Sequence, residues 1–137
     1  MTKEEILEGN KLIAVFMGYQ YYPLPEDRSY NPGWWVKDKQ KTINKISHTY
    51  LCRSHNDLKY HNSMDWLLPV IDKIKNDEEF SIIGGNGDPW EVEIETTGYH
   101  YITQAYCKSI NLIEACWVVC VHYIENFNVG TLRVAKK

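Results

Sequence analysis

Hydrophobic residues recur at helical spacing in three stretches of this chain, and each stretch predicts a helix. The first covers residues 3–17, where Thr2 and Glu5 have the spacing of a capping box. The last begins at Ser109, which can cap a helix, and continues to about Asn126. Its expected buried stripe consists of Ile110, Ile113, Trp117, Cys120, Val121 and Ile124.

The middle stretch starts at Asn62 or Ser63, either of which can cap a helix, and continues to Ile74. Pro69 lies inside this pattern and removes one backbone donor, so a kink or a tightened first half is expected. The expected core-facing residues are Met64, Leu67, Leu68, Ile71 and Ile74, with Trp66 and Val70 widening the stripe.

Between the second and third helices the pattern changes to the two-residue period of a strand. Over residues 90–95 an apolar set alternates with an acidic set: Trp90, Val92 and Ile94 with Glu91, Glu93 and Glu95. This alternation predicts a strand with one buried face and one acidic, wet face. Residues 80–83 are expected to pair with it through a turn at 84–88, and residues 99–106 to add a third strand.

Residues 19–61 show neither period clearly, because prolines and glycine interrupt them. Two aromatic or β-branched pieces, 30–36 and 42–53, fit either strands or a long ordered loop. Because a structureless stretch of this length is unusual in a compact domain, some of the segment is expected to pair as strand. The order of elements predicts one α+β domain over residues 1–137. Its helices are expected to pack on an antiparallel sheet in an α/β/α-sandwich-like arrangement.

Composition narrows the function classes. The 137 residues are 44% hydrophobic and carry a net charge of −3, which fits a globular domain and argues against a protein that coats duplex DNA. The longest apolar run, residues 115–121, is too short to cross a bilayer, and no signal pattern is visible. No membrane association is therefore expected.

The four cysteines are too few and too irregularly spaced for a disulfide scaffold, so all four are expected to be free thiols in the cytoplasm. Cys116 and Cys120 lie four residues apart on the last helix. Small apolar fillers of a buried helix are the favoured interpretation, with a pair of metal ligands as the alternative.

The segment LKYHNSMDWLLPVIDKI, residues 58–74, resembles small uncharacterised proteins of phages and their bacterial hosts. Those proteins carry a Tyr/Phe-His-x-Ser-x-Asp-Trp-Leu-x-Pro-Val pattern after a segment like Leu12–Gly18. The layout is also similar to the phage ABA-sandwich domain. The resemblance covers residues 11–18 and 58–125; it implies a fold, and a host-cell cytoplasmic location if the chain is phage-encoded, but no particular chemistry.

The chain lacks a phosphate loop, a Gly-x-Ser-x-Gly elbow and a His-Glu-x-x-His helix. A polar group at His48, Cys52, His55, Asp57 and His61 has spacings that would permit a metal site or a Cys-His pair. No second Cys-x-x-Cys half accompanies it, so loop residues are the favoured interpretation. No catalytic residue, metal ligand or cofactor is predicted.

Residues 19–61 combine basic and aromatic side chains, carrying seven Lys or Arg against four Asp or Glu. Cations neutralise phosphate and aromatic faces stack on bases, so this segment suits a nucleotide-type ligand. Aromatics that cover the domain's own core, with lysines exposed to solvent, are nevertheless the favoured interpretation of this composition, and the ligand site is the alternative. The candidate ligand-binding residues are Arg28, Tyr30, Trp34, Trp35, Arg53 and His55.

The leading functional hypothesis is a non-enzymatic, phage-type accessory protein that binds a small anionic ligand. Sequestering a nucleotide immune signal, an anti-defence role, would fit by analogy. The competing hypothesis is a structural or interaction protein that forms a homo-oligomer, or contacts a host protein, through a sheet edge or the Trp34 and Trp35 patch. An enzyme that uses Cys52 with His55 comes third.

Overall fold

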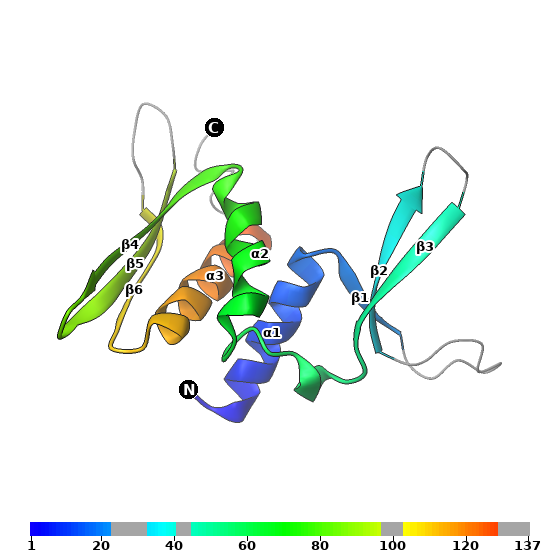
Figure 1. Cartoon of the computed structure of the whole chain (residues 1–137), viewed down its shortest axis with the longest axis horizontal. Coiled ribbons are helices and arrows are strands. Elements are labelled where there is room, and N and C mark those ends of the chain that lie inside the picture. Colours follow the sequence, from blue (N-terminus) through cyan, green and yellow to red (C-terminus); the bar gives the residue numbers. More distant parts are fainter. Residues whose placement is uncertain (23–32, 41–44, 97–102, 129–137) are drawn as a thin grey trace. The chain divides into compact units, whose positions relative to one another are not determined.

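A computed structural model describes residues 1–22, 33–40, 45–96 and 103–128 (Figure 1). The chain divides into two compact units, unit 1 (Met1–Lys59) and unit 2 (Tyr60–Lys137). Each unit contains α-helix and a three-stranded antiparallel sheet. The predicted α+β class is therefore confirmed, with the strands distributed over two sheets.

Unit 1 begins with helix α1, Lys3–Phe16, as the capping box predicts. The Thr2 hydroxyl accepts from the Glu5 backbone N–H at 3.1 Å, and the Glu5 carboxylate accepts from the Thr2 N–H at 3.4 Å. After the helix come β1 (Tyr19–Tyr22), β2 (Gly33–Gln40), β3 (Lys45–Cys52) and the short 3-10 helix η1 (His55–Asp57).

The sheet of unit 1 has the order β1-β2-β3, with both pairs antiparallel. The predicted strands at 30–36 and 42–53 correspond to β2 and β3, and the first of them continues to Gln40. A register irregularity separates Trp34, opposite Cys52, from Trp35, opposite Tyr50. Tyr30 lies outside the described residues.

Unit 2 contains α2 (Met64–Lys75), β4 (Glu78–Gly85), β5 (Asp88–Thr96), β6 (Thr103–Ser109) and α3 (Leu112–Asn128). The strands pair antiparallel in the order β4-β5-β6. Helix α3 packs on β5 and β6, while α2 packs on β4 and on α3 (Figure 1). Helix α3 therefore covers one face of this sheet at β5 and β6, and α2 contacts β4 and α3.

The predicted register of β5 is confirmed. Val92 and Ile94 are fully buried on the helix-covered face, and Glu91, Glu93 and Glu95 remain partly exposed. Because residues opposite each other in a sheet point to the same side, Phe80 and Ala105 lie on the same face as Ile94.

The β4–β5 turn is shorter than the expected five residues. Gly85 pairs with Asp88, so only Asn86 and Gly87 form the loop, with φ of 57° and 92°. Two consecutive positive φ values are those of a type I′ turn, for which Asn-Gly is the preferred sequence. Position 84 also requires glycine, because an added Cβ there would clash with the Pro89 carbonyl oxygen.

Trp90 is half-buried rather than enclosed in the core. Its indole ring lies against Gly85 on the neighbouring strand, where an added Cβ would be 2.8 Å from the ring. The ring thus covers the backbone of a strand glycine that has no side chain of its own to pack.

Two residues expected on buried helix faces, and one expected helix cap, differ from the structure. Leu68 is 49% exposed and Ile110 is 87% exposed, so neither belongs to a buried stripe. Ile110 precedes α3, whose first turn is capped by Asn111: its Oδ1 accepts from the Glu114 N–H at 3.0 Å. The expected cap, Ser109, instead accepts from the Asn111 N–H.

A cluster of hydrogen-bonded polar side chains lies where β4 begins and β5 ends. The side-chain amide of Gln104 donates to the Glu78 carboxylate and to the Thr96 hydroxyl. The Asn126 amide of α3 donates to the Gln104 backbone carbonyl at 3.4 Å, which ties α3 to β6. Among the helices that the structure describes, none has the length and apolar character needed to span a membrane.

Candidate functional site

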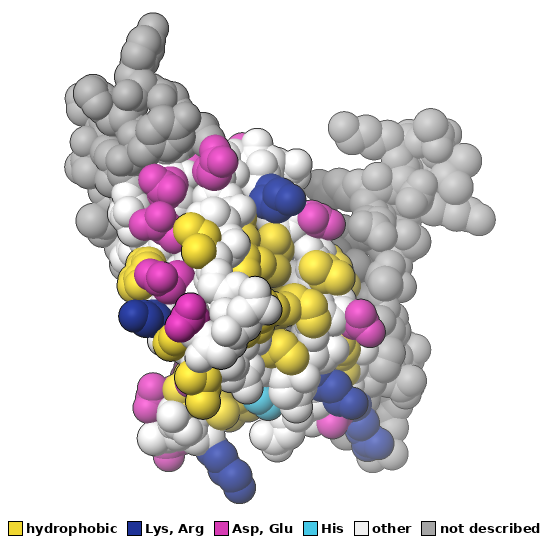
Figure 2. All heavy atoms as spheres, turned by 60° about the vertical axis from the view of Figure 1, so that its left-hand side comes forward, with side chains coloured by type: hydrophobic (Ala, Val, Ile, Leu, Met, Phe, Trp, Pro, Cys, Tyr) yellow, Lys and Arg dark blue, Asp and Glu magenta, His cyan; other side chains and the backbone are white. Residues whose placement is uncertain are grey.

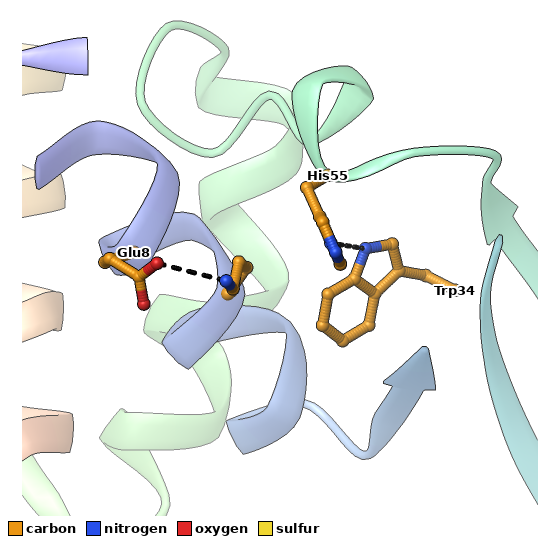
Figure 3. A network of polar contacts seen from close by, with 4 residues as sticks. Glu8, Trp34 and His55 are labelled. Carbon is orange, nitrogen blue, oxygen red and sulfur yellow. Dashed lines mark hydrogen bonds and ion pairs between the residues drawn. The ribbon is translucent and has the colours of Figure 1, made fainter. Parts of the chain in front are cut away.

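Trp34, Tyr21 and His55 form an aromatic cluster in unit 1. Trp34 from β2 is only 3% exposed, and its Nε1–H donates to Nδ1 of His55 at 3.1 Å (Figure 3). The ring of Tyr21 on β1 lies 5.6 Å from the Trp34 ring and 4.3 Å from the imidazole, centroid to centroid. The cluster encloses the indole of Trp34 instead of presenting it as an open stacking face.

The backbone around η1 holds His55 in this position. The Ser54 backbone N–H and hydroxyl both donate to Oδ2 of Asp57, at 3.2 and 3.1 Å. The buried Asn10 of α1 donates from its side-chain amide to the Leu58 carbonyl at 3.1 Å. These contacts fix both ends of the turn that carries the imidazole.

The hydrogen bond from Trp34 specifies the protonation state of His55. Nδ1 must accept, so the neutral imidazole carries its proton on Nε2. Burial lowers the pKa of His55 below its usual value, and the Lys11 ammonium of α1 lowers this pKa further. Glu8, which pairs with Lys11 at 3.0 Å (Figure 3), partly offsets that effect.

These shifts predict that acid weakens unit 1. The unfolded chain binds a proton at His55 near pH 6.5, whereas the folded chain binds it only at lower pH. Stability from this group is therefore complete above about pH 6.5 and decreases as the pH falls toward the lowered pKa. We expect His55→Asn, whose side-chain oxygen can still accept from Trp34, to show a smaller loss of stability between neutral and mildly acidic pH.

The measurement is the free energy of unfolding from urea titrations at several pH values, for wild type and His55→Asn. Burial also lowers the pKa of His61 in unit 2, so part of the acid sensitivity will persist in the variant. Identical pH dependence in the two proteins would show that His55 does not contribute.

The geometry does not pair Cys52 with His55 for catalysis. The Cys52 thiol lies 3.5 Å from the Ser54 carbonyl and donates to it, while Nδ1 of His55 already accepts from Trp34. Burial and the nearby Asp57 carboxylate raise the pKa of Cys52 to about 11, which disfavours the nucleophilic thiolate. The side chain of His48 lies outside the part of the chain that the structure describes.

All four cysteines are free, as predicted. Cys116 and Cys120 are fully buried on α3, and burial raises the pKa of both thiols. Among the side chains that the structure describes, no group of three or more His, Cys, Asp or Glu is arranged to hold a metal ion. The described geometry thus favours Cys116 and Cys120 as apolar fillers of the helix core.

The structure brings together two of the six candidate ligand-binding residues, Trp34 and His55. Arg53 is exposed. Arg28 and Tyr30 lie outside the described residues, as does the side chain of Trp35. The nucleotide-type ligand expected in this segment therefore stays a prediction. Tyr21 is the cluster member that the sequence analysis missed, because a four-residue strand leaves almost no periodic signal.

A second candidate surface is the outer face of the unit 2 sheet, the face opposite α2 and α3. Glu91, Glu93 and Glu95 of β5 point to this face, and Glu79 of β4 lies directly opposite Glu95. We call these four residues the glutamate row. Figure 2 shows a group of acidic side chains close together on one side of the described surface.

Neighbouring side chains hold two of the carboxylates in place. The Tyr106 hydroxyl donates to Oε1 of Glu91 at 2.5 Å, and the Thr103 hydroxyl donates to Oε2 of Glu93 at 2.7 Å. Within the three strands as described, the sole Lys or Arg is Lys108, opposite Glu91. Within these described strands, the outer face therefore combines the four carboxylates of the glutamate row, two of them held by hydrogen bonds, with one cation.

The carboxylates of the row act on one another. Partial desolvation raises the pKa of Glu95, and the nearby Glu93 and Glu79 carboxylates raise it further. Like charges opposite each other in a sheet are unfavourable for folding. A positively charged partner placed on this face would relieve that repulsion.

Comparison with known proteins gives no match: no protein-family model, curated protein or solved structure is significantly similar to this chain. The resemblance to phage proteins is therefore not tested by these comparisons and stays a prediction. The function has to be inferred from the geometry of the chain itself.

Proposed function

We propose that this protein is a non-enzymatic interaction protein that binds a basic macromolecular partner through the outer face of the β4-β5-β6 sheet. The observation that carries the proposal is the glutamate row, which strand register holds on the sheet face that the unit 2 helices leave uncovered. This proposal follows the competing hypothesis, an interaction protein that contacts another protein. It assigns the contact to the outer face of this sheet.

The face has the properties of a binding surface. Glutamates two residues apart on one strand repeat at about 6.6–6.8 Å, so the row presents regularly spaced negative charge. Ile83 and Tyr106, 65% and 45% exposed, add apolar and aromatic area on the neighbouring strands. Acidic side chains beside exposed apolar groups suit a partner with cationic and apolar side chains.

Electrostatic complementarity also sets the expected behaviour of the complex. Charged surfaces of opposite sign accelerate encounter, and added salt screens the attraction. Binding through the glutamate row should therefore weaken strongly as salt is raised.

A fluorescein-labelled oligo-lysine peptide serves as the probe, with fluorescence anisotropy measured at low salt and at roughly 0.2 M salt. The test variant is the triple substitution Glu91→Gln, Glu93→Gln and Glu95→Gln. We expect it to weaken probe binding by about tenfold or more at low salt, because it removes three carboxylates from one face.

A matched control removes the same number of charges elsewhere in unit 2. Asp65, Asp72 and Glu125 are exposed on α2 and α3, so the substitutions Asp65→Asn, Asp72→Asn and Glu125→Gln give the same net charge. The control should lose less than about twofold in affinity. Equal losses in the two triple variants would mean that the probe responds to net charge alone, and the proposal would fail.

A further inference from the structure

We propose that two copies of this chain pair through β4, in an antiparallel arrangement about a two-fold axis at Ile82, to form a continuous six-stranded sheet. The proposal concerns pairing along the edge strand β4, whose Ile83 also lies on the outer face. Pairing of two copies requires no basic partner.

Strand β4 is an edge strand with an apolar centre. It pairs with β5 on one side, and the part of the chain that the structure describes places no strand on its other side. Its central residues Phe80, Ser81, Ile82 and Ile83 include two large exposed side chains, with Ile82 44% and Ile83 65% exposed. An unpaired edge with exposed apolar residues favours pairing with another strand.

The positions of the charged residues on β4 favour antiparallel pairing with a second copy over parallel pairing. Both acidic residues of the strand, Glu78 and Glu79, lie at its start, while its end consists of Gly84 and Gly85. In an antiparallel pair centred on Ile82, Glu79 lies opposite Gly85 of the second copy, so no carboxylate meets another. A parallel pair would place the acidic ends side by side, which is unfavourable.

The register at Ile82 also matches the faces of the sheet. Ile82 is opposite Val92 and so belongs to the helix-covered side, where its exposed part would contact Ile82 of the second copy. Ile83 is opposite Glu91, on the outer side, and would lie against Ser81 of the second copy. A two-fold axis perpendicular to the sheet keeps the two outer faces on one side, so both glutamate rows would lie on the same face of the six-stranded sheet, on either side of the paired β4 strands.

The first measurement is the mass in solution, by analytical ultracentrifugation over a concentration series. Wild type is expected to shift from the 16.1 kDa monomer toward twice that mass as its concentration is raised. Ile82→Lys and, separately, Ile83→Lys place like charges near the two-fold axis and should keep the chain monomeric. Ile110→Lys, at an exposed apolar residue outside β4, is the control and should dimerise like wild type.

The second measurement tests directly whether the Ile82 residues of the two copies lie opposite each other. Directly opposite residues have Cβ atoms about 4.5–5.5 Å apart, close enough for a disulfide bond in many pairs. With oxidised glutathione as the electron acceptor, Ile82→Cys should form a covalent dimer on a non-reducing gel. Leu68→Cys, similarly exposed but on α2, should not.

Each outcome supports or overturns the proposal. A wild-type chain that stays monomeric across the concentration series overturns it. A dimer that persists in both lysine variants, or one that cross-links equally at Leu68→Cys, means that another surface pairs. A variant that loses its circular dichroism signal is set aside, and the Ile82→Cys result then decides.

Discussion

Replacing Trp34 by alanine is expected to lower the free energy of unfolding of unit 1 by about 3–5 kcal/mol, the usual cost of deleting a buried tryptophan. Trp34 is 3% exposed and contacts both Tyr21 and His55, so its removal leaves a cavity beside two rings. It also leaves Nδ1 of His55 without its donor. Both the cavity and the lost hydrogen bond lower the free energy of unfolding.

The readout has to be local because the chain forms two compact units. Hydrogen exchange of the amides in β1 and β2 should become faster in Trp34→Ala, while exchange in β5 serves as the internal reference. Trp34→Phe is the matched control: it keeps most of the ring and loses the hydrogen bond, so about 1 kcal/mol is expected from that bond. Unchanged exchange in Trp34→Ala would show that the indole is not part of the core of unit 1.

The sequence predicts unit 2 well because its elements carry strong periodic patterns. Val92 and Ile94 alternate with glutamates, and a strand with that pattern can bury only one face. The buried residues of α2, Leu67, Val70, Ile71 and Ile74, likewise follow helical spacing. In both elements the period of the apolar residues and the required burial indicate the same structure.

The errors occur where periodicity stops being informative. Leu68 continues the apolar stripe of α2 but lies at its margin, and a periodic pattern does not show how wide a face the neighbouring elements cover. Ile110 precedes the helix because Asn111 competes successfully with Ser109 for the cap. In the hairpin, Asn86 and Gly87 accept positive φ, which lets the strands extend up to a two-residue turn.

The candidate sites depend on long-range pairing that no local pattern encodes. Tyr21 and Trp34 are opposite each other only because β1 pairs with β2, and His55 reaches them through a 3-10 turn after β3. For the glutamate row, the alternation predicted the wet face of β5. The position of Glu79 opposite Glu95 required the register of β4, which the turn sets.

Replacing Ile94 by alanine is expected to destabilise unit 2 by about 2–5 kcal/mol, the range for truncating a buried isoleucine. Ile94 is fully buried at the centre of β5, opposite Phe80 on one side and Ala105 on the other. Helix α3 packs on both β5 and β6, so the lost side chain lies between the sheet and that helix. The cavity cannot be filled by water without exposing apolar surface.

The neighbouring residue provides the matched control. Glu93 is on the same strand but faces the outer side, where Thr103 donates to its carboxylate. Glu93→Ala should therefore cost less than about 1 kcal/mol, as is usual for exposed polar contacts. Urea denaturation of both variants, followed by hydrogen exchange in β5, measures the difference. Equal losses, or a larger loss for Glu93→Ala, would contradict the assignment of the two sheet faces, and with it the position of the glutamate row on the side that the helices leave uncovered.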